Sequence, residues 1–323
     1  MSEEREQAIE AVSALISHGR REMAKIIVGQ SELIDGILIA LICGGHVLVE
    51  GVPGLGKTLA IKSLARMLQL SFQRVQCTSD LMPADLLGTN VLNMRSAEFA
   101  LHKGPMFTDL LLVDEINRMP PRTQASLLES MEERQVTIDG VRYPLSEFFT
   151  VLATQNPIEF EGTYPLPEAQ VDRFLLKLKL GYPAVEEELK VLEGHHAGLY
   201  ERGATAIEIA SIDTELLRQA RQQLRAIRVE DSLFRYITEL VRRTRTWPSV
   251  SLGASPRAAV SLMLVAKAMA ALDGRDFVVP DDVKQAALPA LRHRMLLRPE
   301  AELEGVDTDR VVAEVISSVE VPR

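Results

Sequence analysis

The sequence predicts an α/β fold, in which a parallel sheet flanked by helices is followed by a smaller domain made of helices alone. Three features of the 323-residue chain favour this fold. A strand, a glycine-rich loop and a helix follow one another from residue 47 to residue 70, and further apolar runs alternate with amphipathic segments as far as residue 180. After Gly181-Tyr182-Pro183 the apolar residues recur at helical spacing. We therefore expect two domains, over residues 1–182 and 183–323.

The first 45 residues predict two helices. Residues 1–24 have the pattern of a polar amphipathic helix, and residues 25–30 form a short connector. Ser31 is a candidate N-cap for a second, apolar helix, which should stop at Gly44-Gly45.

A phosphate-binding loop follows the first predicted strand. The segment Gly51-Val52-Pro53-Gly54-Leu55-Gly56-Lys57-Thr58 has the G-x-x-x-x-G-K-[ST] spacing, and a helix begins at about Leu59. The glycines let backbone N–H groups close round a polyphosphate, and Lys57 can place its charge on the β- and γ-phosphates. The Thr58 hydroxyl can ligate Mg²⁺, and the helix directs its positive end at the anion. We expect residues 51–59 to bind the phosphates of a nucleotide.

Residues 71–77 alternate between apolar and polar side chains well enough to predict a second strand. After residue 77 this alternation stops. Between residues 78 and 107 the sequence has no clear period. An irregular stretch of about 30 residues inside a compact domain is usually functional or a local insertion. The segment could project loops toward a substrate or a pore, or it could be a surface excursion.

Two acidic residues end the next predicted strand. The apolar run over residues 110–113 reads as a buried strand, and Asp114-Glu115 follows it directly. In a phosphate-loop protein, Asp114 is suited to support the Mg²⁺ shell, and Glu115 is the candidate base for the attacking water. The alternative is that both acids only solvate the end of the strand.

A helix, a hairpin and a further strand come next. Residues 121–134 form a good amphipathic helix, and residues 135–147 a hairpin around Asp139-Gly140. The strand over residues 149–154 ends in Gln155-Asn156-Pro157. The Asn156 amide could hold the attacking water or contact the γ-phosphate, or it could only cap the turn before the proline.

Two arginines are further candidates for the site. Arg173 ends a short predicted helix before the last strand, over residues 175–180, and it could pair locally or reach the γ-phosphate of a neighbouring subunit. Arg257 follows Ser255-Pro256, which should cap a helix, so it has a fixed place from which to reach back toward the nucleotide. The helices expected beyond the boundary are 184–196, 213–227, 230–246, 256–273 and 281–295.

Composition limits the functions that the chain can have. The formal net charge of -9 and the sequence pI of about 5.3 argue against a general binder of nucleic acid or anionic membranes. Cys43 and Cys77 fit no metal or disulfide pattern, so we expect reduced structural thiols. The N-terminus is unlike a signal peptide, and the longest uncharged apolar run, over residues 36–45, is too short to cross a bilayer. These features predict a cytoplasmic protein without membrane insertion.

Taken together, these motifs resemble the MoxR family of AAA+ ATPases over roughly residues 20–300. The motifs over residues 162–170 and 253–257 distinguish this family best from other ATPases, because many ATPases share the phosphate loop and the acid pair. The motifs are Gly51-Val-Pro-Gly-Leu-Gly-Lys-Thr58, Leu112-Val-Asp-Glu-Ile-Asn-Arg118, Leu127-Leu-Glu-Ser-Met-Glu-Glu133, Ala153-Thr-Gln-Asn-Pro157, Gly162-Thr-Tyr-Pro-Leu-Pro-Glu-Ala-Gln170, Asp172-Arg-Phe174 and Gly253-Ala-Ser-Pro-Arg257.

The resemblance implies a role for each candidate residue. Lys57 and Thr58 are similar to the Walker A lysine and its Mg²⁺ ligand, and Asp114 and Glu115 to the Walker B pair. Asn156 resembles sensor 1. The remaining positions that the resemblance assigns are Arg173 as an arginine finger acting in trans, Arg257 as the sensor 2 arginine of the helical lid, and Val28, Gly29 and Gln30 as the lining of the adenine.

The resemblance also implies the activity and the partners. ATP, ADP and Mg²⁺ are the expected cofactors, residues 78–107 resemble the helix-2 insert, and residues 135–147 the pre-sensor-1 hairpin. Family members typically form hexameric rings and act as chaperone-like motors. They commonly serve proteins with a von Willebrand A domain, including in cofactor insertion or enzyme maturation.

Three alternatives stay open on the same fold. A nucleic-acid remodelling motor is disfavoured by the acidic balance and by the lack of a dense basic stripe with aromatic residues. A magnesium-chelatase-like motor subunit is hard to separate from a MoxR-type ATPase by sequence. A binding module gated by nucleotide would not need Glu115, Asn156 and Arg173 together.

Overall fold

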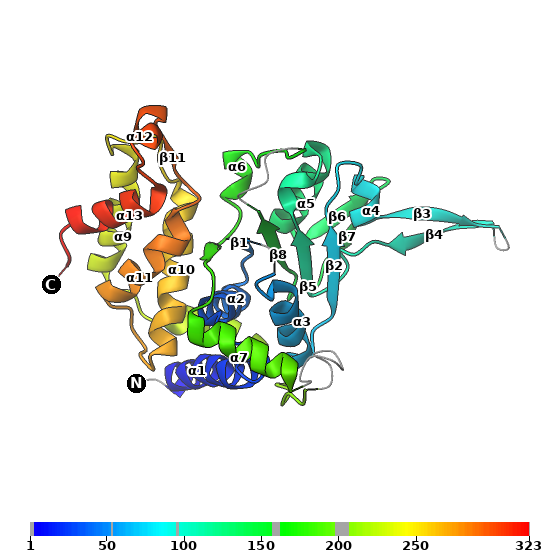
Figure 1. The fold of residues 1–323 in the computed structure, drawn as a ribbon, viewed down its shortest axis with the longest axis horizontal. Coiled ribbons are helices and arrows are strands. Elements are labelled where there is room, and N and C mark those ends of the chain that lie inside the picture. The colour runs from blue at the N-terminus through cyan, green and yellow to red at the C-terminus, as the bar shows by residue number, and fades with distance from the viewer. Residues whose placement is uncertain (1–2, 53, 95–96, 157–161, 198–206, 323) are drawn as a thin grey trace.

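The computed structural model describes residues 3–52, 54–94, 97–156, 162–197 and 207–322. It confirms the predicted fold class, a parallel sheet flanked by helices and followed by a mainly helical region (Figure 1). The strands are β1 (Val47–Gly51), β2 (Phe72–Gln76), β3 (Gly88–Asn93), β4 (Glu98–Lys103), β5 (Leu110–Asp114), β6 (Gln135–Ile138), β7 (Val141–Pro144), β8 (Thr150–Gln155), β9 (Leu176–Leu180), β10 (Val250–Leu252) and β11 (Leu296–Leu297). The helices are α1 (Glu3–Met23), α2 (Ser31–Cys43), α3 (Lys57–Met67), α4 (Pro83–Leu87), α5 (Pro121–Glu133), α6 (Glu168–Val171), α7 (Val185–His196), α8 (Thr214–Gln223), α9 (Asp231–Arg245), α10 (Pro256–Leu272), α11 (Pro280–Leu291), α12 (Pro299–Leu303) and α13 (Thr308–Ser318).

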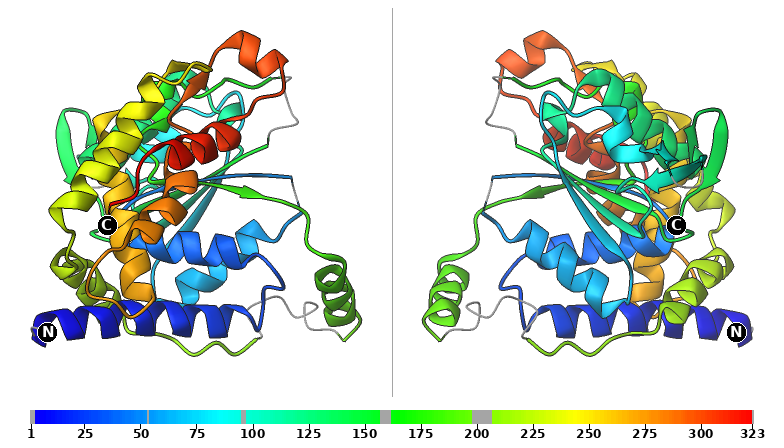
Figure 2. Two further views of the ribbon diagram at one scale, coloured as in Figure 1. Left: turned by 90° about the vertical axis from the view of Figure 1, so that its left-hand side faces the viewer. Right: turned by 90° about the vertical axis from the view of Figure 1, so that its right-hand side faces the viewer.

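Five parallel strands form the main sheet in the order β2-β5-β8-β1-β9. Successive side chains of a strand point to opposite faces, so each strand contributes to two cores. Leu110, Leu112 and Leu152 join a large apolar cluster with α1, α2 and α3, whereas Leu111 and Val113 pack with α5 on the other face. Figure 2 shows α1 running beneath α2, so two layers of helices cover the first face. This arrangement fixes the carboxyl ends of the strands along one edge.

Helix α2 begins differently from the expectation. Ser31 is the first helical residue and not the N-cap, because Gln30 precedes it in the left-handed conformation, with φ 60°, and gives no side-chain cap. The helix ends as predicted, since Gly44 adopts φ 67° and closes its last turn. Cys43, the last residue of α2, and Cys77 are both free thiols.

Most of the described part of the segment over residues 78–107 is regular, which corrects the prediction of an irregular stretch. It contains α4 and the antiparallel hairpin of β3 and β4, which projects away from the body (Figure 1). Most side chains of β4 are exposed on both faces. A strand that is solvated on both sides has no apolar alternation, so the sequence pattern could not reveal it. The hairpin of β6 and β7 around Asp139-Gly140 confirms the prediction for that segment.

The C-terminal helices pack against the N-terminal part of the chain. Helix α8 lies against α1 and α2, and α10 contacts the same two helices, so one apolar cluster includes residues from both regions. The short ladder of β10 and β11 and the last helices, α12 and α13, were not foreseen. The domain boundary between residues 182 and 183 stays a prediction.

A buried histidine gives stability a pH dependence. His46 accepts a hydrogen bond at Nδ1 from the Val151 N–H (2.9 Å), so Nε2 carries the proton and donates to the Met131 carbonyl (3.2 Å). Burial lowers the pKa of His46 from 6.5 to about 3. The unfolded chain therefore binds a proton that the folded chain does not bind between those two pH values, and the free energy of unfolding falls as the pH drops below about 6.5.

We expect His46→Gln to reduce this pH dependence. Between about pH 7 and about pH 5.5, the original chain should lose about 1 kcal/mol more of its free energy of unfolding than the variant. Urea titrations of both proteins at the two pH values measure this difference. Equal losses would mean that His46 is not held neutral in the folded chain.

Candidate functional site

A cavity of about 420 Å³ opens at the carboxyl ends of β1, β5 and β8. The carboxyl ends of parallel strands meet at one edge of a sheet, so residues that are distant in the sequence gather there. The structure brings together the predicted phosphate loop, acid pair and amide. The lining residues are Gly51, Gly54, Leu55, Gly56, Lys57, Thr58, Leu59, Arg74, Gln76, Asp114, Glu115, Thr154 and Asn156.

The phosphate loop has the backbone that an anion site needs. Gly54 and Gly56 adopt positive φ angles, 88° and 72°, and a Cβ at either position would meet no atom within 4 Å. The Lys57 ammonium donates to the Gly51 carbonyl (2.8 Å). Burial lowers the pKa of Lys57, while the charges of Asp114 and Glu115 oppose the shift. An anion in this cavity would face a lysine that is held at the start of α3.

Asp114 ends β5 with both carboxylate oxygens engaged. Oδ2 forms an ion pair with Arg74 Nε (2.6 Å), and Oδ1 accepts a hydrogen bond from the Thr154 hydroxyl (3.1 Å). Arg74 and Gln76, at the end of β2, were not predicted as site residues. The sequence shows that they lie near the end of a strand, but only the pairing of β2 with β5 places them beside Asp114.

Glu115 is held in a left-handed conformation with φ 58°, which is uncommon for a residue other than glycine. Its N–H donates to the Thr154 hydroxyl (2.9 Å), and its carboxylate pairs with Arg118 Nε (2.9 Å) and accepts from Gln76 Nε2 (3.2 Å). Glu115 lines the same cavity as Lys57. A carboxylate in this position can act as a general base.

The metal-binding capacity of the cavity is limited. Thr58 and Asp114 both line it, but among the residues that the structure describes no group of three or more His, Cys, Asp or Glu side chains could hold a metal ion. Mg²⁺ commonly takes one or two protein oxygens together with substrate phosphates and waters. The donor set therefore fits a Mg²⁺ ion that arrives with a nucleotide.

Some predicted nucleotide contacts lie elsewhere or outside the described residues. Val28, Gly29, Gln30 and Val52 do not line the cavity, and Pro53 lies outside the described residues. Gly29 has φ 71°, and a Cβ there would lie 2.7 Å from Glu187 Oε2 of α7. The adenine-binding role of residues 28–30 remains a prediction.

Arg173 and Arg257 lie together at the other end of the strands from the phosphate loop, where the amino ends of β1 and β9 lie. We call this end the amino edge of the sheet. The two arginines line a cavity of about 250 Å³ that also contains Gly45 and His46, which directly precede β1. Arg257 forms an ion pair with Glu132 of α5, as does Arg173. Arg257 does not line the phosphate-loop cavity of its own chain. Its sensor 2 role remains a prediction.

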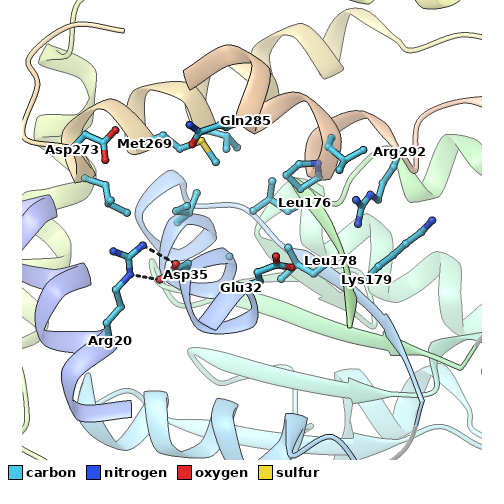
Figure 3. Close-up of a pocket in the computed structure, with 16 residues that line it drawn as sticks. Arg20, Glu32, Asp35, Leu176, Leu178, Lys179, Met269, Asp273, Gln285 and Arg292 are labelled. Atoms are coloured by element: carbon cyan, nitrogen blue, oxygen red, sulfur yellow. Dashed lines mark hydrogen bonds and ion pairs between the residues drawn. The ribbon is translucent and has the colours of Figure 1, made fainter. Parts of the chain in front are cut away.

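A third cavity, of about 400 Å³, lies between α2, β9 and the helices α10 and α11 (Figure 3). Its walls include Leu176, Leu178 and Met269, and Arg20 forms two hydrogen bonds with Asp35 (both 2.7 Å) at one end. None of the predicted site residues lines it.

The fold and the first cavity define a phosphate-loop ATPase, and comparisons with known proteins agree. Residues 46–176 match the ATPase family associated with various cellular activities (AAA), and residues 242–315 match the AAA lid domain. The chain is 44% identical to the uncharacterized protein YeaC of Bacillus subtilis, over 97% of both chains. It is 40% identical to Chaperone MoxR1 of Mycobacterium tuberculosis, over 94% of this chain and 81% of that one.

A solved structure supports the same assignment. The crystal structure of an inferred ATPase from Cytophaga hutchinsonii matches with a TM-score of 0.89 and 40% identity, over 98% of both chains. The chain belongs to the MoxR family of AAA+ ATPases. In the described residues, no helix is both long and apolar enough to span a membrane.

Proposed function

We propose that this ATPase works with Mg²⁺ in a ring of identical subunits, six as the family resemblance implies, and that a neighbouring subunit completes each site. The position of Arg173 carries the proposal. Arg173 precedes the amino end of β9, whereas the phosphate loop follows the carboxyl end of its parallel neighbour β1. The five residues of β1 span about 16 Å, more than an arginine side chain can bridge. Arg173 therefore suits the γ-phosphate of another subunit.

The cavity residues have complementary roles in hydrolysis. Lys57 binds the β- and γ-phosphates, Asn156 holds the attacking water, and Glu115 accepts its proton. Thr58 and Asp114 would hold Mg²⁺, which neutralises phosphate charge when it is bound. The guanidinium of Arg74 competes with the metal for Asp114, since the two are paired at 2.6 Å.

Assembly should therefore limit the rate of turnover. We expect ATP hydrolysis per subunit to rise with protein concentration, in parallel with the mass measured by light scattering. The reason is that Arg173 of an isolated subunit lies outside its own phosphate-loop cavity, and the Arg74 that lines this cavity is paired with Asp114. Steady-state assays over a wide dilution series test this expectation. Turnover per subunit that stays constant down to monomer would contradict a site shared between subunits.

We propose further that the ring remodels or activates protein clients, and that the hairpin of β3 and β4 contacts them. Its tip exposes large apolar side chains, with Met94 86% and Phe99 73% exposed. Asn90 donates to Asp139 (2.7 Å), so this hairpin is joined to the hairpin of β6 and β7. Exposed apolar surface favours a protein partner, and the net charge of -9 disfavours nucleic acid. Stimulation of turnover by DNA, lost with added salt, would favour the nucleic-acid alternative.

The remaining parts of the proposal rest on the family alone. They are a partner protein with a von Willebrand A domain, a role in cofactor insertion or maturation of a client enzyme, and action in the cytoplasm. MoxR1 is named a chaperone, which agrees with this class of function.

A further inference from the structure

A single carboxylate holds the two arginines at the amino edge of the sheet. Glu132, near the end of α5, accepts from Arg257 Nη2 at Oε1, and its Oε2 lies 3.0 Å from Arg173 Nε. Each oxygen of Glu132 thus serves one arginine. The two guanidinium groups come from different regions of the chain, the loop before β9 and the first turn of α10.

The backbones that carry the arginines are also fixed to one another. Asp172, which precedes Arg173, accepts a hydrogen bond from the Ser255 hydroxyl (2.8 Å), and Ser255 caps α10 by accepting from the Arg257 N–H (3.1 Å). The side chain of Arg294 is only 1% exposed, and it donates to Asp172 Oδ1 (2.7 Å) and to the Phe174 carbonyl (2.7 Å). This network keeps the start of α10 beside the loop that carries Arg173.

The guanidinium groups of Arg173 and Arg257 can bind an anion in addition to Glu132. Their side chains are 26% and 44% exposed, so part of each guanidinium group is open to solvent beside Glu132. Arg134 and Arg294 line the same cavity, where the carboxylates are those of Glu132 and Asp172. A phosphate group could engage both guanidinium groups from the open side of this edge.

We propose that Glu132 is a positioning residue that holds Arg173 and Arg257 as a pair, so that both act on one nucleotide bound by the adjacent subunit. The inference rests on the proposed function, which supplies the shared site, and adds the residue that orders it. Without Glu132 the two like charges lose their common partner and spread apart. A misplacement of about 1 Å costs on the order of 10²-fold in rate, so we expect Glu132→Gln to lower turnover by about that factor.

The binding of ATP by the variant itself should be unchanged, since its phosphate loop lies at the other edge of the sheet. Glu132 is exposed, so the substitution places no new polar group in the core. Glu133→Gln is the matched control. Glu133 is the next residue of α5, is also exposed, and forms no ion pair with any described residue.

Mixing two variants of low activity tests whether Glu132 acts on the nucleotide site of the neighbouring subunit. Glu115→Gln subunits have a defective phosphate-loop cavity and an intact arginine pair. Glu132→Gln subunits have an intact phosphate-loop cavity and a disordered arginine pair. Assemblies of both should turn over ATP faster than either variant alone, because intact sites then meet intact arginine pairs. A loss that was only structural would not be restored by mixing.

A parallel mixture of Arg173→Ala with Glu115→Gln separates two failures. If this mixture gains activity while the mixture with Glu132→Gln does not, the role assigned to Glu132 is wrong and the shared site stands. If neither mixture gains activity, the proposal of a shared site fails, and the role of Glu132 fails with it.

Discussion

Replacing Arg173 with alanine is expected to lower ATP turnover by about 10³-fold or more, with ATP binding by the same chain unchanged. The γ-phosphoryl group develops charge that a guanidinium neutralises in the transition state. The other arginine at the phosphate loop, Arg74, is already paired with Asp114 (2.6 Å), so we do not expect it to replace Arg173. Arg173 lies in the cavity at the amino edge of the sheet and not in the phosphate-loop cavity. The substitution therefore separates catalysis from binding.

The measurement is kcat by steady-state assay, with the affinity for a fluorescent ATP analogue measured on the same preparation. Arg173→Lys should recover only part of the loss, because an ammonium keeps the charge but not the planar fork of donors. Arg242→Ala removes an exposed arginine from the last turn of α9 and serves as the control. If Arg173→Ala keeps normal turnover, Arg173 is only the ion-pair partner of Glu132.

The sequence predicted best those parts of the site that are contiguous in the chain. The phosphate loop and the acid pair each follow a buried strand, so their motifs and their positions at the sheet edge come from the same few residues. Arg74 could not be found this way. Its place beside Asp114 depends on β2 pairing with β5, and strand order follows from packing over the whole domain.

The arginine cluster shows the same limit more clearly. Arg257 begins a helix as predicted, with Ser255 as its cap, but the cap does not determine where the helix lies. The packing of α10 on α1 and α2 and the Arg294 bonds to the loop before β9 place Arg257 beside Arg173. Neither contact has a local signal in the sequence. The sequence did not predict the hairpin of β3 and β4 for another reason, because its solvated strands lack a buried face and so show no apolar alternation.

Replacing Glu115 with glutamine should lower turnover by about 10²–10⁴-fold while ATP remains bound. The amide has the size of the carboxylate but cannot accept the proton of the attacking water. The backbone should be unaffected, since glutamine and glutamate meet the same cost at φ 58°, and the Glu115 N–H bond to Thr154 does not involve the side chain. Single-turnover hydrolysis and nucleotide affinity, with Glu129→Gln as an exposed control on α5, measure the two effects separately.

This variant also provides the means to test the client hypothesis, because it holds the ATP-bound state. A von Willebrand A domain protein or an enzyme that lacks its cofactor should be retained by Glu115→Gln in the presence of Mg²⁺ and ATP. Adding Phe99→Ser should abolish that retention without changing ATP affinity, because Phe99 is exposed on the projecting hairpin and lies outside the phosphate-loop cavity. If retention survives the loss of Phe99, the clients bind a different surface.

If Glu115→Gln hydrolyses ATP at the normal rate, another group must take the proton, and the role assigned to the acid pair is wrong.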